Sequence, residues 1–115
     1  MKTQEIPAAV AIALDHFEHH LADPITPTSL AKSAGISPLR FARLMKRFFG
    51  LTPSQYIAKN RIAAASVLLR ETDQPVTDIA MSCGYYDHSA FTRAFRKIAG
   101  VSPTQFRERQ GASRR

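Results

Sequence analysis

The sequence has little of what marks several large classes of protein. It contains a single cysteine, Cys83, so it can form neither an internal disulfide nor a cysteine-rich zinc site, and this usage fits a reducing cytoplasm. No apolar run approaches the length of a membrane span, and residues 1–20 lack the hydrophobic stretch of a signal peptide. Phosphate-binding and dinucleotide-binding glycine motifs are missing, and no nucleophile–base pair can be argued. The sequence therefore favours neither an enzyme nor a bound cofactor.

Negative charge is also scarce. Lys and Arg total 16 against 9 Asp and Glu, which gives a net charge of +7 over 115 residues. Such a balance favours an anionic partner, either a nucleic acid or a membrane surface. The 44% of hydrophobic residues argues against disorder, and the length suits one domain or two very small ones that share a core.

One segment of the chain occurs twice. Residues Leu30 to Tyr56 recur as Ile79 to Phe106, with one extra residue in the turn of the second copy. A repeated unit in a basic chain indicates a protein that uses the same structural unit at two sites. The matching residues are Ala31, Ser33, Gly35, Phe41, Arg43, Lys46, Gly50, Pro53 and Gln55 in the first copy, and Ala80, Ser82, Gly84, Phe91, Arg93, Arg96, Gly100, Pro103 and Gln105 in the second.

The apolar periodicity is helical throughout. Residues 7–21 place apolar side chains at spacings of four and three, and no segment alternates apolar and polar residues long enough for a strand. Helix starts are marked by a hydroxyl residue directly before a proline, and Asp87 takes the place of the hydroxyl once. We predict an all-α chain of seven short helices. The residues that carry these patterns are Val10, Leu14, Phe17 and Leu21 for the stripe, and Ser37, Thr52, Asp87 and Ser102 for the helix starts.

Each repeat is predicted to be a helix, a tight turn and a second helix. Gly35 and Gly84 suit a turn that needs a positive φ, and the alanine four residues before each glycine lets two helices cross closely. This is the helix-turn-helix pattern, and its occurrence in two copies in register makes it specific. The expected organisation is a first helix-turn-helix subdomain (1–52), a linker helix (53–72), a second helix-turn-helix subdomain (73–110) and a frayed basic tail (111–115).

The second helix of each repeat has two chemically different faces. One face is apolar, and the opposite face carries an arginine and, three residues later, another cation. Charged helix faces are usually no more than solvated surfaces. The equal placement of the cations in both copies favours DNA contact instead. The apolar faces comprise Phe41, Leu44, Met45 and Phe48, and Phe91, Ala94, Phe95 and Ile98; the opposite faces comprise Leu39, Arg43 and Lys46, and Ser89, Arg93 and Arg96.

From about Ala8 to Arg109 the chain resembles the DNA-binding domain of AraC/XylS-type bacterial transcription regulators. The residues that carry the resemblance are Arg61, Ala65, Leu68 and Leu69, then Ile79, Ala80, Gly84, Tyr85, Phe91 and the run 93–97, and finally Gly100, Ser102 and Pro103. The resemblance implies two helix-turn-helix units joined by a long helix. It also implies transcription activation or, in some members, repression, with double-stranded DNA as a partner. RNA polymerase would be a second partner during activation, and an effector ligand would act only through a separate domain if one exists.

The joining helix can be interpreted as a spacer. A helix from Pro53 to Glu71 would be about 28 Å long, which is close to the ~34 Å between successive major-groove openings on one face of DNA. One monomer would then read an asymmetric site of about two helical turns. The second helix of each repeat would be the recognition helix that enters a groove. DNA bending is required if the two recognition helices lie closer together than the groove repeat.

The resemblance also assigns roles to individual residues. The base-reading positions fall on Leu39, Ala42 and Arg43 in the first recognition helix and on His88, Ser89, Thr92 and Arg93 in the second. Leu39 and Ala42 offer no hydrogen bonds but can contact thymine methyl groups, so we expect Arg43 to provide most hydrogen-bond recognition in its unit. Ser89 and Thr92 are alternatively simple surface residues. Phosphate contacts are expected from Arg40, Lys46, Arg47, Arg96 and Lys97.

Other chemistry has weak support. His16, His19 and His20 can place two imidazoles on one helix face, but no clear third ligand completes a zinc site, so we interpret them as solvated and predict no metal. Cys83 is interpreted as a small core residue.

Two alternative functions remain. One is a protein-interaction module with degenerate helix-turn-helix units and only non-specific DNA affinity, against which Arg43 and Arg93 count. The other is a basic membrane-surface protein, for which no helix combines a broad exposed apolar face with basic flanks.

Overall fold

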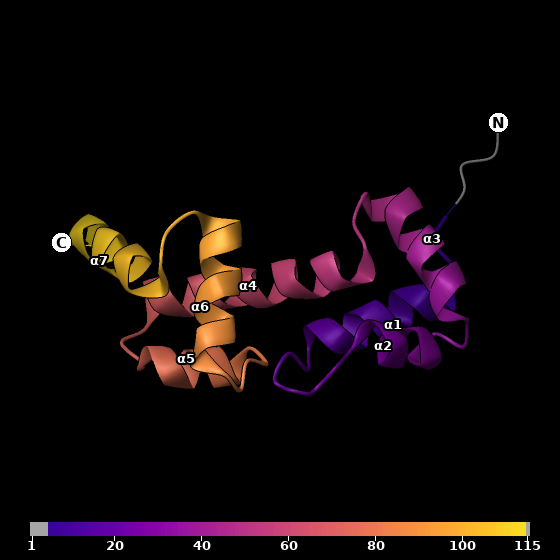
Figure 1. Cartoon of the computed structure of the whole chain (residues 1–115), viewed down its shortest axis with the longest axis horizontal. Helices are drawn as coiled ribbons and strands as arrows, with labels where there is room; N and C mark the ends of the chain where they lie inside the picture. Colours follow the sequence, from indigo (N-terminus) through magenta and orange to yellow (C-terminus); the bar gives the residue numbers. More distant parts are fainter. Residues whose placement is uncertain (1–4, 115) are drawn as a thin grey trace. The chain divides into compact units, whose positions relative to one another are not determined.

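The described part of the chain is all-α. The computed structural model describes residues 5–114, with side chains described for residues 5–110, and within this part it contains seven helices and no strand (Figure 1). The prediction of an all-α chain of seven helices is confirmed. The helices are α1 (Ala8–Glu18), α2 (Pro27–Ser33), α3 (Pro38–Phe49), α4 (Pro53–Glu71), α5 (Val76–Ser82), α6 (His88–Ala99) and α7 (Pro103–Arg114).

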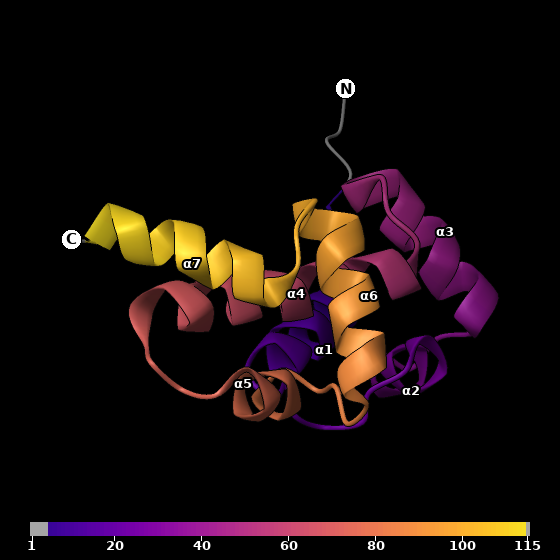
Figure 2. The ribbon, with the colours of Figure 1, turned by 60° about the vertical axis from the view of Figure 1, so that its left-hand side comes forward.

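The chain divides into two compact units, residues 1–57 (unit 1) and residues 58–115 (unit 2). Unit 1 contains α1, α2, α3 and the first residues of α4, and unit 2 contains the rest of α4 with α5, α6 and α7 (Figure 2). The long helix α4 therefore supplies side chains to two separate cores. Within the described residues, none of the helices has both the length and the apolar character needed to cross a membrane.

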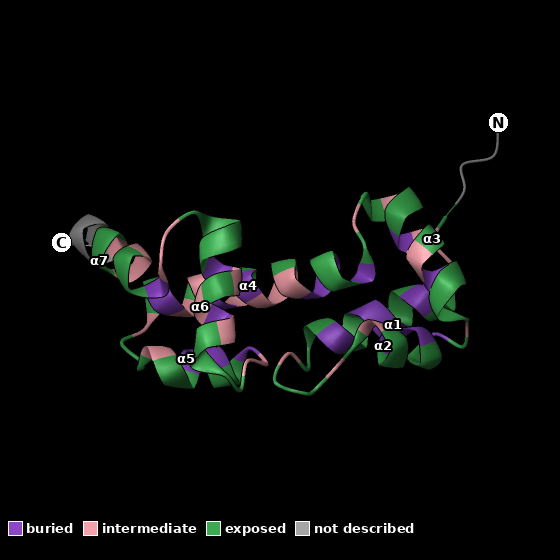
Figure 3. Ribbon diagram, in the orientation of Figure 1, coloured by how far each residue is buried: buried purple, intermediate pink, exposed green. Residues whose placement is uncertain are grey.

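The core of unit 1 is formed where three helices and the start of α4 meet. The predicted stripe on α1 is buried at Val10, Leu14 and Phe17, whereas Leu21 lies beyond the end of the helix and is half-buried against the core. Figure 3 colours the helices by burial, with buried residues in purple. The remaining buried side chains come from the other helices and the α2–α3 turn. They are Leu30, Ala31, Ala34, Phe41, Met45, Tyr56 and Ile57, together with Ala13 of α1.

A hydrogen bond ties α4 to α1 inside unit 1. The hydroxyl of Tyr56 donates to Oε1 of Glu18 over 2.5 Å, and the Tyr56 ring packs near those of Phe17 and Phe49 at centroid distances of 6.2 and 5.2 Å. A partly buried tyrosine that keeps a partner for its hydroxyl contributes apolar area without leaving a polar group unsatisfied.

The core of unit 2 is richer in aromatic contacts. Four rings form a chain in which neighbouring centroids lie 5.5 Å (Tyr85–Phe91), 5.8 Å (Phe91–Phe95) and 5.5 Å (Phe95–Phe106) apart. Tilted and edge-on pairs of this kind contribute about 0.5–1.5 kcal/mol each beyond the area that they bury. The aliphatic part of this core is supplied by Ile62, Ala65, Leu69, Ile79 and Ala80, with Cys83 buried beside them.

One residue predicted for the apolar face of α6 lies elsewhere. Ile98 is 41% exposed and does not belong to the core of unit 2, so its prediction was wrong. The helical period continues through the last turn of α6, but the core ends one turn earlier, at Ala94 and Phe95. The periodicity of a helix cannot show where the elements that cover it stop.

Equivalent capping interactions begin α4 and α7. Thr52 and Gln55 exchange hydrogen bonds between side chain and backbone N–H at 2.9 and 3.1 Å, and Ser102 and Gln105 do the same at 3.0 and 3.1 Å. This reciprocal capping box explains why the repeat keeps a hydroxyl residue, a proline and a glutamine at fixed spacing. The backbone of α7 continues into residues 111–114, where a tail was expected; the side chains of residues 111–115 lie outside the described residues.

Candidate nucleic-acid interface

The turn between the two helices of each repeat has the same geometry in both units. The backbone N–H of Ile36 donates to the carbonyl oxygen of Ala31 over 3.2 Å, and the N–H of Tyr85 donates to that of Ala80 over 2.9 Å. Gly35 lies at φ +72° and Gly84 at φ +92°, in the left-handed region that only glycine enters without strain. The predicted role of the two glycines is confirmed.

The alanines of the repeat let the helices approach each other. Ala31 is fully buried and Ala80 is 2% exposed, each on the first helix of its helix-turn-helix motif (α2 and α5) and part of the core of its unit. A larger side chain at either position would overlap with the tightly packed neighbours of the second helix. The geometry of both units is thus that of a helix-turn-helix motif.

The second helix of each motif is held by one buried face. In unit 1, Phe41 and Met45 of α3 are fully buried, and in unit 2 the equivalent residues Phe91 and Phe95 of α6 are fully buried. Because these anchors are four residues apart, they fix the rotation of each helix about its own axis and leave the opposite side in solvent.

The solvent-facing side of α3 carries half of the residues predicted to contact DNA. Arg40, Arg43, Lys46 and Arg47 are exposed, Leu39 is 62% exposed, and Ala42 is half-buried. Two of the cations have local contacts. Lys46 donates to the carbonyl oxygen of Gly50 over 3.4 Å, and the Arg47 guanidinium lies 5.8 Å from the centre of the Phe48 ring.

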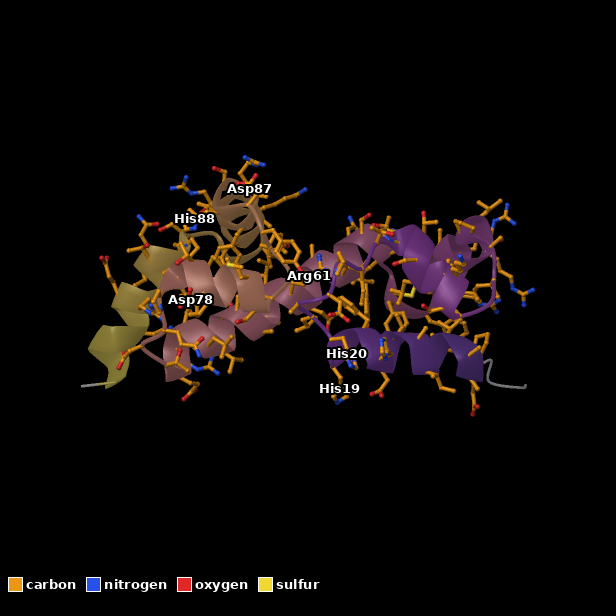
Figure 4. The ribbon with its side chains drawn as sticks, turned by 90° about the horizontal axis from the view of Figure 1, so that it is seen from below. His19, His20, Arg61, Asp78, Asp87 and His88 are labelled. Carbon is orange, nitrogen blue, oxygen red and sulfur yellow. The ribbon has the colours of Figure 1, made fainter. Side chains whose placement is uncertain are left out.

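The equivalent side of α6 is more polar at its beginning. His88, Ser89, Arg93, Arg96 and Lys97 are exposed, and Thr92 is half-buried. Figure 4 labels Asp87 and His88 near each other, where this helix begins. The Asp87 carboxylate accepts the backbone N–H of Ser89 over 3.0 Å, as Ser37 accepts that of Arg40 over 3.1 Å in unit 1. Both predicted N-caps are confirmed.

The charge of these faces is uncompensated. Neither α3 nor α6 contains an aspartate or glutamate, although the chain has nine. Within residues 5–110 no salt bridge joins a cation of either helix to a carboxylate, and the ion pairs Asp15–His19 and Arg70–Glu71 lie on α1 and at the end of α4. Exposed cations without acidic partners create a positive local potential that attracts the phosphates of a nucleic acid.

One residue beside the interface was missed in the sequence. The turn of unit 2 is one residue longer than that of unit 1, and the extra residue is Tyr86, which is 63% exposed directly before Asp87. An exposed tyrosine at the start of a recognition helix places a hydrogen-bonding hydroxyl where phosphates approach such helices. The difference in turn length was the feature that could have identified it.

The other candidate groups lie away from these two faces. The rings of His16 and His20 on α1 are stacked with centroids 4.0 Å apart, and no group of three or more possible metal ligands occurs among the described residues. The backbone carbonyl of Asp15, 2.8 Å from Nδ1 of His19, and the nearby Asp15 carboxylate raise the pKa of His19 above its ordinary value. Cys83 is 1% exposed, as predicted for a core residue, and its burial raises the pKa of the thiol.

Known proteins share both the sequence and the fold. The family described as a helix-turn-helix domain matches residues 30–109. The HTH-type transcriptional activator RhaS of Escherichia fergusonii is 36% identical over 96 residues, which cover 84% of this chain and 34% of RhaS. The regulatory protein SoxS of Salmonella typhimurium is 31% identical over 96 residues, 84% of this chain and 90% of SoxS. The chain thus spans about a third of the length of one relative and nearly all of the other.

Among solved structures, the chain is similar to the DNA-binding domain of AdpA, a global transcriptional factor, in complex with a target DNA. The two share 28% sequence identity with a TM-score of 0.88, over 92% of this chain and 96% of that domain. The similarity therefore extends through both helix-turn-helix units.

Proposed function

The chain belongs to the AraC/XylS-type family of helix-turn-helix regulators, and we propose that it binds one defined sequence of double-stranded DNA with both recognition helices. DNA binding is the common property of the family's domain. The sequence specificity and the use of both helices are the further steps, and they depend on the residues that α3 and α6 present to solvent.

The observation that carries the proposal is the equal placement of one arginine on each recognition helix. Arg43 and Arg93 are exposed, lack a carboxylate partner within residues 5–110, and each follows a fully buried phenylalanine by two residues. A guanidinium held on such an anchored helix can form two parallel hydrogen bonds to O6 and N7 of guanine in the major groove. If Arg43 and Arg93 were only solvated surface residues, there would be no physical reason for them to occupy the same position in both units.

The remaining cations supply affinity without sequence preference. Arg40, Lys46 and Arg47 on α3, and Arg96 and Lys97 on α6, suit contacts to phosphates on either side of the groove. Ser89, Thr92 and His88 add hydrogen-bonding groups for bases at the start of α6.

The continuity of α4 supports binding to two successive grooves. It is an unbroken helix of 19 residues whose side chains enter both cores. A rigid helix of that size is about 28 Å long, of the order of the ~34 Å groove repeat. We therefore propose an asymmetric site read by one copy of the chain, with bending of the DNA if the helices are set closer than the groove repeat.

We propose that the chain regulates transcription in the bacterial cytoplasm, and that it acts as an activator through contact with RNA polymerase. RhaS is an activator by its name, and SoxS a regulatory protein. The chain covers about a third of RhaS and 90% of SoxS, and we propose that an effector ligand acts only through a separate domain if one exists.

Selection of bound duplexes from a random pool tests the proposal. We expect a motif of two blocks about one helical turn apart. The variants Arg43→Ala and Arg93→Ala should each weaken binding by about 1–3 kcal/mol and relax the preference at one base pair in one block. Affinities should be measured at several salt concentrations, because phosphate contacts alone give binding that falls steeply with salt.

A matched control separates base reading from phosphate binding. Lys97→Ala, next to Arg96 on the same helix, should weaken binding to all duplexes alike and reduce the salt dependence. If no motif is enriched and both arginine variants behave like Lys97→Ala, the chain is a basic interaction module and the proposal is wrong.

A further inference from the structure

The two recognition helices differ at two of the three predicted base-reading positions that they share. In α3 these positions hold Leu39 and Ala42 before Arg43, and in α6 they hold Ser89 and Thr92 before Arg93. The backbone positions are equivalent, since the residues fall second and fifth in helices of the same length with the same anchors. The difference is therefore one of chemistry on a shared scaffold.

Packing in the core does not account for the position of Leu39. Its side chain is 62% exposed on a helix where most of the other exposed residues are cations, and it does not belong to the core of unit 1. The N-terminal residues of a recognition helix are those that contact base edges in the major groove. In the major groove the base pairs present hydrogen-bonding groups and one kind of apolar group, the methyl of thymine.

From this arrangement we infer that unit 1 recognises a thymine by apolar contact, through Leu39, beside the guanine read by Arg43. The inference rests on the proposed DNA-binding function. Leu39 and Arg43 are one helical turn apart, a rise of roughly 6 Å, so the two bases lie within about two base pairs of each other. Unit 2 instead recognises its half of the site by hydrogen bonds from Ser89 and Thr92.

Two physical effects make the leucine selective. Burial of the thymine methyl against the side chain removes apolar surface of both groups from water, which favours binding. A cytosine at the same place has only a hydrogen at C5, so the apolar contact with the leucine is lost, and its N4 amino group takes the place of the thymine O4. Ala42, three residues after Leu39, is small and half-buried.

The experiment uses the duplex selected from the random pool. The block bound by α3 is identified as the one whose base preference is relaxed in Arg43→Ala. Each thymine of the duplex is then replaced by deoxyuridine, one at a time, which removes only the methyl group, and the dissociation constant is measured by fluorescence anisotropy. One such replacement in the α3 block should weaken binding of the unmodified protein about three- to fivefold, the effect of one buried methyl group.

The variant Leu39→Ser places in α3 the residue that α6 has at the equivalent position, and because Leu39 is largely exposed the fold should be retained, which circular dichroism checks. Its dissociation constant should no longer change with that deoxyuridine, while deoxyuridine in the α6 block affects both proteins equally. If no thymine of the α3 block matters, or the effect persists in Leu39→Ser, the inference is wrong although the proposed function stands. If selection yields no motif, the proposed function fails and the inference fails with it.

Discussion

Units 1 and 2 each bury a phenylalanine at the same place on the recognition helix, Phe41 and Phe91, but the cores around them are built differently. Phe41 is followed by Met45 and lies in the same core as Phe17 of α1 and Tyr56 of α4, whereas Phe91 lies within a chain of four rings from Tyr85 to Phe106. The turn glycines, the buried alanines and the capping boxes are nevertheless the same in both units. The comparison shows which parts of the motif set its geometry: the turn and the anchor must be kept, and the surrounding packing can be exchanged.

The outward faces differ in another way. Unit 1 presents a leucine and an alanine before its arginine, and unit 2 presents a serine and a threonine. Leu39 and Ser89 are exposed and Ala42 and Thr92 are half-buried, so packing constrains these positions less than the anchors, and they can diverge at little cost to the fold. Each unit is thus free to recognise a different half of an asymmetric site.

Removal of the anchors should have the largest effect on the comparison. Phe41→Ala and Phe91→Ala should each lower the free energy of unfolding by about 3–5 kcal/mol, because a fully buried ring is replaced by a cavity. Residue-resolved hydrogen exchange should show protection lost first in the unit that carries the change. Phe49→Ala, at a 41% exposed ring, is the control and should cost much less. Equal loss of protection in both units would mean that the two cores form one cooperative structure.

The attachments of α4 should give the next largest difference between the units. In unit 2, Nε and Nη2 of Arg107 donate to the carbonyl oxygens of Leu69 and Thr72 at 3.3 and 3.1 Å, and so satisfy the end of α4. Arg107→Ala should lower stability by about 1.5–3 kcal/mol, since charged donors to buried acceptors are lost. Tyr56→Phe in unit 1 should lower it by about 1 kcal/mol, because one hydrogen bond is removed and the ring remains.

Urea unfolding of both variants checks this order. Arg107→Lys serves as the control, because lysine keeps the positive charge but lacks the planar guanidinium that donates to both carbonyl oxygens. A Tyr56→Phe effect larger than that of Arg107→Ala would contradict the account of how α4 is held.

Removal of the two N-caps of the recognition helices should have similar effects on protein stability but different effects on DNA affinity. Ser37→Ala and Asp87→Ala each remove one side-chain acceptor and should lower stability by about 1 kcal/mol. Asp87→Ala should also strengthen non-specific DNA binding, because a negative charge is removed beside the phosphates, whereas Ser37→Ala should not. Thermal melting and anisotropy with a random-sequence duplex measure the two effects. If both variants change DNA affinity equally, the carboxylate of Asp87 lies away from the DNA.

The smallest effect concerns a pH dependence confined to unit 1. The pKa of His19 is raised by the Asp15 carbonyl and, secondarily, by the Asp15 carboxylate. A raised folded pKa means that the protonated imidazolium stabilises the fold, so this contribution is present below the ordinary value of 6.5 and is lost as pH rises through the folded value. An NMR titration should find the pKa of His19 above its ordinary value, and Asp15→Asn should lower it part of the way. No change in Asp15→Asn would show that the carboxylate has no influence.

Much of the interface could be predicted from the sequence because its rules are local. A turn glycine with positive φ, an N-cap before a proline, and anchors at helical spacing depend only on residues a few positions apart. All the cations predicted to contact DNA are accordingly found exposed, and the anchors buried. Their roles toward bases and phosphates stay predictions.

By itself, then, the sequence determined the seven helices, the two helix-turn-helix motifs, the anchors and the outward residues. Only the tertiary structure decided that Ile98 is exposed, that α1 ends at Glu18, and that α4 is held by Glu18 in one unit and by Arg107 in the other. Those features join residues far apart in the chain, such as Tyr56 with Glu18 and Arg107 with Leu69. Helical periodicity tells which side of a helix is apolar, but the partner that covers it, and where that cover ends, depend on how separate helices pack in space.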